Sequence, residues 1–225
     1  MADSPTLRAG ESDAKEVGAI AFADAIQEAA KDRDRVRVAI PGASIANVGV
    51  RAVAILAERG FDLERLCLTW VDERCVNVAS PDSNRGAIEF TPEPGTLLPL
   101  VLDDEAPSDS VARVDHELRS TFDSALDVVL LGMGPDGHIA SLFPGHPELP
   151  GLVGHVDNSP KPPPNRITLT RKILETAQTT LLVATGEPKR EALMRILAGD
   201  TELPATGLPN LSIITDIPIE EENRA

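Results

Sequence analysis

The stretch that decides the fold reads Leu130-Leu131-Gly132-Met133-Gly134-Pro135-Asp136-Gly137-His138-Ile139-Ala140-Ser141-Leu142-Phe143-Pro144. An apolar run that begins at Leu126 ends there at a glycine loop, and His138 follows where a short helix could begin. In an open α/β sheet, ligands bind in the loops after the carboxyl ends of strands, and glycines let backbone N–H groups approach an anion. The order therefore predicts a functional site, the alternative being a tight turn whose glycines only accept positive φ.

The strand-and-loop order recurs along the chain. Strands are expected at 36–40, 66–71, 97–101, 126–131, 166–170, 180–185 and 211–215, and helices at 12–31, 45–59, 108–122, 172–176 and 188–197. This alternation predicts an α/β fold with a mostly parallel open sheet and helices on both faces. Seven of the 19 prolines fall between Pro144 and Pro164, so that segment is expected to be a lid or surface loop without regular structure.

Length and composition set limits on the class of protein. A chain of 225 residues with 42% hydrophobic residues predicts a single α/β domain over 1–225, with frayed ends at 1–11 and 218–225. The sequence begins with no secretory signal pattern, and no apolar run reaches the 18 or so residues that span a bilayer. A cytoplasmic protein without a membrane partner is expected.

Charge and cysteine content narrow the partners further. The formal net charge of −15 repels nucleic acid, so an anionic small molecule would need a local cluster of Arg, Lys and backbone amides. Cys67 and Cys75 lack CxxC spacing, which predicts reduced thiols and neither a disulfide framework nor a zinc site.

Two other predicted strands end in polar loops. Pro41-Gly42-Ala43-Ser44 follows 36–40, and Asp72-Glu73-Arg74 follows 66–71. The second is either an ordinary solvated strand end or a functional cluster at the carboxyl edge of the sheet.

Three segments occur in an order and spacing typical of one family. They are Gly132 to His138 with Ser141-Leu142-Phe143-Pro144, Val71 to Arg74 with Asp82-Ser83-Asn84, and Pro162 to Leu169. Together they resemble the 6-phosphogluconolactonase family, within the sugar-phosphate isomerase and deaminase superfamily. Their order and spacing also match, and the resemblance extends from about residue 12 to about 215.

The resemblance implies a fold like that of glucosamine-6-phosphate isomerase/deaminase. It implies hydrolysis of 6-phospho-D-glucono-1,5-lactone to 6-phosphogluconate in the oxidative pentose phosphate pathway, without a cofactor or metal, by a monomer or homodimer. His138 would activate water, and Asp136 or Asp72 would orient the imidazole ring of His138. The residues expected to bind substrate are Gly42, Ala43, Ser44, Glu73, Arg74, Asn84, Gly132, Gly134, Gly137, Arg166 and Lys189.

The chemistry of these residue types agrees with the resemblance. A lactone is an activated ester, so its hydrolysis needs a base, donors for the developing oxyanion and a cationic group for the phosphate. A histidine with an ordinary pKa of about 6.5 suits neutral pH. The backbone N–H groups of Gly132 to Gly137 could stabilise the oxyanion, and Arg74 offers a planar fork to phosphate. A covalent route through Ser44 or Ser141 is less favoured, since neither lies in a Gly-x-Ser-x-Gly elbow.

One loop departs from the family pattern. The family shows Gly-Gly-Ser-Thr-Pro or similar after its first strand, whereas this chain has Gly42-Ala43-Ser44-Ile45-Ala46. Ala43 adds a methyl group, and Ile45 lacks a hydroxyl that a threonine would restore. We expect a weaker phosphate site, by about 1 kcal/mol for one lost hydrogen bond.

Two alternatives to a lactonase stay open at this point. A glucosamine-6-phosphate deaminase has a similar Asp-Gly-His run, but its Asp-Glu motif continues with tyrosine, whereas this chain has Arg74 there and no tyrosine. A non-catalytic sugar-phosphate-binding protein would also fit the altered Gly42 loop.

Overall fold

A computed structural model of the chain describes residues 5–219. Within them the main sheet has seven strands in the order β1-β10-β9-β6-β2-β3-β5, and every neighbouring pair is parallel. In that order the strands are Thr6–Arg8, Leu211–Thr215, Thr179–Ala184, Val128–Gly132, Val36–Ile40, Leu66–Trp70 and Thr96–Leu98. The expected parallel α/β sheet is confirmed.

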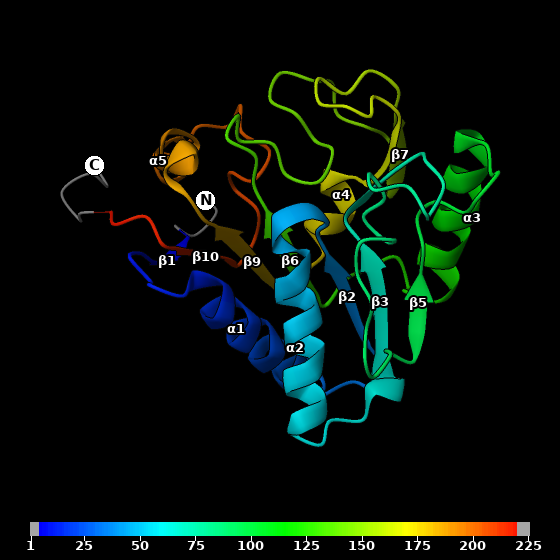
Figure 1. Cartoon of the computed structure of the whole chain (residues 1–225), viewed down its shortest axis with the longest axis horizontal. Coiled ribbons are helices and arrows are strands. Elements are labelled where there is room, and N and C mark those ends of the chain that lie inside the picture. Colours follow the sequence, from blue (N-terminus) through cyan, green and yellow to red (C-terminus); the bar gives the residue numbers. More distant parts are fainter. Residues whose placement is uncertain (1–4, 220–225) are drawn as a thin grey trace.

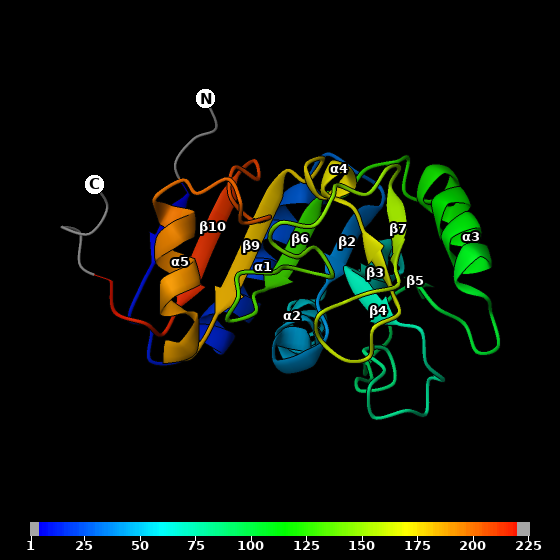
Figure 2. The ribbon, with the colours of Figure 1, turned by 90° about the horizontal axis from the view of Figure 1, so that it is seen from above.

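Helices cover both faces of this sheet (Figures 1 and 2). Helix α1 (Ala14–Ala29) lies beside α2 (Ala46–Glu58) and contacts β9, β6, β10 and β2, because Phe22, Ala23 and Ile26 form its buried face. In both views β9 and β10 separate α1 from α5 (Arg190–Leu197). The remaining helices are α3 (Pro107–Ser120) and α4 (Arg171–Leu174), with 3-10 turns η1 (Ala43–Ile45), η2 (Leu63–Arg65) and η3 (Glu187–Lys189). None of the helices in 5–219 is both long and apolar enough for a membrane span.

A small antiparallel sheet, absent from the sequence-based expectations, stands beside the main one. It consists of β4 (Asp72–Arg74), β8 (Arg166–Leu169) and β7 (Val153–Val156), in that order. Asp72 to Arg74 is therefore more than a strand end, and the 144–164 segment contains a strand, contrary to the prediction. Neither strand shows a hydrophobic pattern of its own, because each is only three or four residues long and is defined by its pairing with β8.

Two further expectations were wrong. Residues 1–11 are not frayed throughout, since β1 pairs with β10 and Gly10 N donates to Ile217 O; residues 1–4 and 220–225 lie outside the described residues. No helix begins at His138, because the chain turns back on itself there. Gly134 N donates to His138 O and Gly137 N donates to Gly134 O.

The strand order places one crevice at the carboxyl edge. From β2 the chain proceeds to β3 and β5 on one side, then returns to β6, β9 and β10 on the other. The loops after β2 and β6 therefore leave the sheet in opposite directions, and such a switch point is where ligands bind in open α/β sheets.

The start of α3 carries a pH-dependent contribution to stability. The Glu105 carboxylate accepts from Arg113 Nε and Nη2, both at 2.8 Å, and from Ser110 Oγ at 2.6 Å. The bonds from Arg113, opposed by partial burial and helped by Ser110, lower the pKa of Glu105 from 4.5 to about 2. We expect Glu105→Gln to lower the free energy of unfolding at pH 7 by about 1–3 kcal/mol, as for a hydrogen bond to a charged group.

The sign of the pH dependence follows from the lowered pKa. Below about pH 4.5 the unfolded wild type takes up a proton that the folded state refuses until about pH 2, so the contribution of Glu105 is lost over that window. Urea unfolding should therefore show the difference between wild type and Glu105→Gln shrinking from pH 7 to pH 3. Glu28→Gln, which loses only an exposed pair with Lys31, is the control. A difference that is the same at both pH values would contradict the prediction.

Candidate active site

The loops after β2, β3, β6 and β9 surround one cavity of about 260 Å³. Most of the site residues predicted from the sequence line it, and Glu73, Asp136 and Gly137 do not. The lining residues are Pro41, Gly42, Ala43, Ser44, Ile45, Val71, Asp72, Arg74, Asn84, Gly132, Met133, Gly134, Pro135, His138, Ala140, Arg166 and Lys189.

His138 is oriented by Asp136. The distance from Nδ1 to Asp136 Oδ1 is 2.5 Å, and the imidazole side chain is 19% exposed. With Nδ1–H donating to the carboxylate, Nε2 keeps its lone pair and can act as a base. Partial burial opposes ionisation of Asp136, but the hydrogen bond and charge of His138, with the charge of Lys161, lower the pKa of that carboxyl.

The ring of His138 sits directly over a glycine. A Cβ on Gly134 would lie 2.2 Å from both Nδ1 and Cε1 of His138 and 2.5 Å from Asp136 Oδ1. The ring also packs against Phe143, with ring centroids 4.8 Å apart and the two planes tilted by 37°. The amide groups of Gly134 and Gly137 are already bonded within the turn, so these two do not supply the oxyanion donors expected from the sequence.

Asp72 does not bond to His138, contrary to one of the two expectations for the orienting carboxylate. Its carboxylate accepts from Ser141 Oγ at 2.6 Å and from Asn84 Nδ2 at 3.2 Å, and Arg166 Nη1 lies 3.6 Å away. Asp72 therefore joins β4, β8 and the loop after β6 at the wall of the cavity. The Ser141 hydroxyl is engaged as a donor in this network.

Asn84 closes the cavity against the loop after β2. A Cβ on Gly42 would lie 1.8 Å from Asn84 Oδ1, so this contact requires glycine. Asn84 is 2% exposed and its Nδ2 donates to Asp72 O at 2.9 Å. Its Oδ1 is buried and has no hydrogen-bond partner among the described residues, which leaves an acceptor at the wall of the cavity.

Glu73 and Gly137 have structural roles instead of the expected contacts with substrate. The Glu73 carboxylate accepts from the backbone N–H groups of Arg74, Asn84 and Arg85, and so organises the loop after β4. Gly137 has a φ of 85°, and a Cβ there would meet Leu203 at 2.6 Å. The sequence motif identified both positions, but their side chains or Cα face the interior.

Three cationic side chains reach the cavity, with different numbers of donors in use. Arg74 donates through Nη1 to Asp82 O at 2.8 Å, and its buried Nε has no partner among the described residues. Burial, then the charge of Lys15, lower the pKa of Lys189, and Asp216 opposes them. Arg166 is 3% exposed, and its Nε and Nη2 are occupied by backbone carbonyls of 161–163. Arg74 and Lys189 are therefore better placed than Arg166 to bind an anion.

The departure in the loop after β2 has a structural explanation. Ile45 is 2% exposed and belongs to the core, where its Cγ1 would lie 3.1 Å from a Cβ on Gly132. A threonine at position 45 would lose part of this core packing, so the substitution would do more than restore a hydroxyl donor. Ala43 has a φ of 51°, a left-handed conformation that glycine adopts without strain and alanine adopts at a cost of about 1 kcal/mol.

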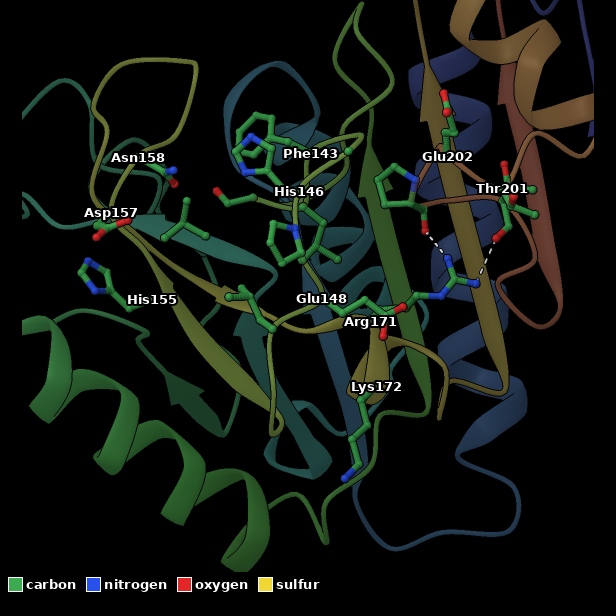
Figure 3. Close-up of a pocket in the computed structure, with 18 residues that line it drawn as sticks. Phe143, His146, Glu148, His155, Asp157, Asn158, Arg171, Lys172, Thr201 and Glu202 are labelled. Carbon is green, nitrogen blue, oxygen red and sulfur yellow. Dashed lines mark hydrogen bonds between the residues drawn. The ribbon is translucent and has the colours of Figure 1, made fainter.

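A second cavity, of about 570 Å³, lies beyond Phe143 (Figure 3). Its walls come from the segments 141–149, 155–158 and 201–206 and from α4. Arg171 points into it but donates to Pro204 O and Thr206 O at 2.7 and 2.9 Å. No site residue predicted from the sequence lines this larger space. The smaller cavity therefore holds the reactive groups.

One contact near His138 was missed by the sequence analysis. Lys161 Nζ lies 3.4 Å from Asp136 Oδ2, so the orienting carboxylate has a basic partner from the proline-rich segment. The lysine directly precedes one of the motifs used above, but no sequence pattern shows that two loops separated by β7 meet there.

Comparison with known proteins identifies relatives over nearly the whole chain. A family model described as glucosamine-6-phosphate isomerases/6-phosphogluconolactonase matches residues 11–213. The 6-phosphogluconolactonase of Rattus norvegicus is 35% identical over 224 residues, covering 91% of this chain and 87% of the relative. The corresponding human protein is 34% identical, with coverage of 90% and 86%.

Solved structures give the same result. The 6-phosphogluconolactonase of Thermotoga maritima aligns with a TM-score of 0.80 and 26% identity, over 94% of this chain and 98% of the other. A monomeric glucosamine-6-phosphate deaminase aligns with a TM-score of 0.76 over 93% of this chain and 96% of the other. Because that deaminase is only 16% identical, it shows the shared fold alone.

Proposed function

We propose, from the premise that the chain belongs to the family of glucosamine-6-phosphate isomerases and 6-phosphogluconolactonases, that it hydrolyses 6-phospho-D-glucono-1,5-lactone to 6-phosphogluconate, the lactone step of the oxidative pentose phosphate pathway. The observation that carries this proposal is the His138–Asp136 pair beside a cavity that Arg74 and Lys189 also line. A binding protein would need the cations but not an oriented base. The same pair distinguishes the lactonase from the non-catalytic alternative.

The reaction uses His138 twice. Nε2 takes a proton from water as the water oxygen attacks the lactone carbonyl carbon, which forms a tetrahedral oxyanion. Collapse of that intermediate breaks the bond to the ring oxygen, and the imidazolium returns the proton to this leaving oxygen. Asp136 stabilises the imidazolium between the two steps and holds the ring in the required tautomer.

We infer that the phosphate group binds Arg74 and Lys189, which line the cavity together with Gly42, Ala43 and Ser44. A dianion compensates two cations that the lining brings together in a chain of net charge −15. Asn84 holds the wall of the cavity beside Gly42, since its Nδ2 donates to Asp72 and its Oδ1, which has no partner among the described residues, is buried against the Gly42 backbone. Arg166 also lines the cavity, where it holds Asp72 and Ser141 in place.

The proposal is tested by activity on two substrates. The purified protein should release 6-phosphogluconate from freshly prepared 6-phosphogluconolactone faster than the spontaneous hydrolysis, which is measured in parallel and subtracted. It should release no ammonia from glucosamine 6-phosphate. The reverse result would favour the deaminase, and binding of 6-phosphogluconate without turnover would favour a non-catalytic protein. The proposed cytoplasmic location and monomeric or dimeric state are tested by fractionation and analytical ultracentrifugation.

Arg74→Ala should weaken recognition of the phosphate group. Loss of one charge-assisted hydrogen bond, worth about 1.5–3 kcal/mol, should raise KM for the phosphorylated lactone by roughly 10- to 100-fold. The effect on unphosphorylated glucono-1,5-lactone should be several-fold at most, because that substrate never made the contact. Steady-state kinetics on both lactones measure the two changes.

The control is Arg119→Ala, which removes the same charge from an exposed pair with Asp115 on α3. This control changes the net charge of the protein by the same amount as Arg74→Ala. It should leave KM for both lactones nearly unchanged. Equal effects of Arg74→Ala on the two lactones would remove Arg74 from the proposed phosphate site.

A further inference from the structure

We propose that Lys161 is a positioning residue of this site, whose ammonium group holds the second oxygen of Asp136 and so fixes the carboxylate that orients His138. The inference rests on the proposed lactone hydrolysis for its kinetic consequence, but not for its structural one. Lys161 does not line the cavity, so its action on the reaction passes through Asp136.

The two oxygens of Asp136 have separate partners. Oδ1 lies 2.5 Å from His138 Nδ1, and Oδ2 lies 3.4 Å from Lys161 Nζ. A carboxylate with one bonded oxygen can rotate about its terminal torsion, which is broad for aspartate. A second partner on the other oxygen restricts that rotation. The plane of the carboxylate, and with it the direction of Nε2, is then defined from two sides.

The backbone of Lys161 is itself fixed, which allows a half-exposed side chain to act in this way. Lys161 O accepts from Arg166 Nη2 and from Ser159 Oγ, both at 2.8 Å, and Lys161 N donates to Ser159 Oγ at 3.2 Å. Arg166 Nε also donates to Pro163 O at 3.0 Å. Arg166, a buried arginine on β8, thus holds the backbone of the proline-rich segment from which Lys161 contacts Asp136.

Holding this backbone gives Arg166 a role different from direct phosphate binding. Its guanidinium links Asp72, which lines the cavity, to the backbone carbonyls of 161 and 162, in the segment whose Lys161 contacts Asp136. Phe143 lies under the same guanidinium, 5.9 Å from its carbon to the ring centroid, and also contacts His138. The chain of contacts from Arg166 through Lys161 to Asp136 therefore ends at the ring that carries out the reaction.

The charge of Lys161 has a predictable effect on proton transfer. It offsets the negative charge of Asp136, so that carboxylate stabilises the imidazolium less than it would alone. The other charged groups around the ring come from separate elements: Asp72 and Arg74 from β4, Arg166 from β8, and Lys189 from η3. Removing Lys161 leaves these in place and should make His138 hold its proton to higher pH.

The variant Lys161→Met tests this. It keeps most of the aliphatic length of the side chain and loses the charge, whereas Lys161→Arg keeps both. In Lys161→Met, the less restricted Asp136 should lower kcat several-fold while KM changes little, because Lys161 does not line the cavity. The acidic limb of the kcat/KM profile should also move to higher pH by roughly half a unit, as expected for one partly screened charge several ångströms away. Lys161→Arg should keep the wild-type limb. Lys31→Met, which breaks an exposed pair with Glu28 on the opposite face of the sheet from α5, is the matched control.

A second readout does not depend on lactonase activity. The imidazole ¹³C–¹H signals of the four histidines can be followed by NMR from pH 5 to 9, and that of His138 is identified by its loss in His138→Asn. The midpoint of this signal should rise in Lys161→Met in parallel with the kinetic limb. A wild-type protein without lactonase activity would refute the proposed function and leave this titration to decide the role of Lys161. An unmoved midpoint, or equal shifts in Lys161→Met and Lys31→Met, would overturn the inference.

Discussion

Replacing His138 with alanine is expected to lower kcat for 6-phosphogluconolactone by about 100-fold or more while the protein stays folded. The ring supplies the base that activates water and the acid that protonates the leaving oxygen, and general acid–base catalysis contributes about 10²–10⁴-fold. No other described imidazole lines the cavity, so none replaces it. Initial rates above the spontaneous reaction measure the change, and urea unfolding checks the fold.

KM should change much less than kcat in this variant. The phosphate contacts through Arg74 and Lys189 are separate from the ring, so substrate still binds. His116→Ala, at an exposed position of α3, is the control and should keep wild-type kinetics. Near-normal turnover of His138→Ala would show that the assigned base is wrong, even if the protein is a lactonase.

The main sheet could be predicted because its strands carry local signals. The strands 36–40 and 211–215 were predicted to the residue, since each is an apolar run with turn residues or charges beside it. The strands β1, β4 and β7 could not, because each is short and exists through a partner elsewhere in the chain. Hydrophobic periodicity reports burial of a segment on its own, and these segments are defined by pairing.

The candidate site divides in the same way. His138, Arg74, Lys189 and the Gly42 loop follow the carboxyl ends of neighbouring parallel strands, so the fold class itself brings them together. What the sequence left open was which partner each side chain chooses. The structure shows that His138 bonds to Asp136 while Asp72 bonds to Ser141, and that Lys161 contacts Asp136. These contacts depend on how far the loops extend across the edge of the sheet, which the sequence does not reveal.

A glycine gives the second large effect that we expect. Gly134→Ala should lower kcat nearly as much as His138→Ala, because the new methyl group would lie 2.2 Å from Nδ1 and Cε1 of the ring. Real side chains do not tolerate that distance, so the imidazole must move away from Asp136 or out of the cavity. A displacement of about 1 Å in a catalytic group can cost roughly 100-fold.

The backbone should accept this substitution even though the site does not. The φ of Gly134 lies outside the left-handed region, so alanine adds no conformational strain there, unlike at Gly137. The free energy of unfolding should therefore fall by no more than about 2 kcal/mol. Gly132→Ala is the matched control, since it adds the same methyl group at the end of β6, two residues earlier, but meets Ile45 at 3.1 Å and touches no part of His138. It should lose only several-fold in kcat.

The comparison separates a misplaced base from a damaged loop. If Gly134→Ala acts through the ring, it should lower kcat far more than Gly132→Ala at similar stability. Combining it with His138→Ala should then add little, because residues that act as one unit are not additive. If the two glycine variants lose activity equally, the conformation of this segment affects catalysis more than the position of the His138 ring does. If Gly134→Ala keeps full activity, the ring works from a different position, and Asp136 no longer explains how Nε2 comes to face the lactone.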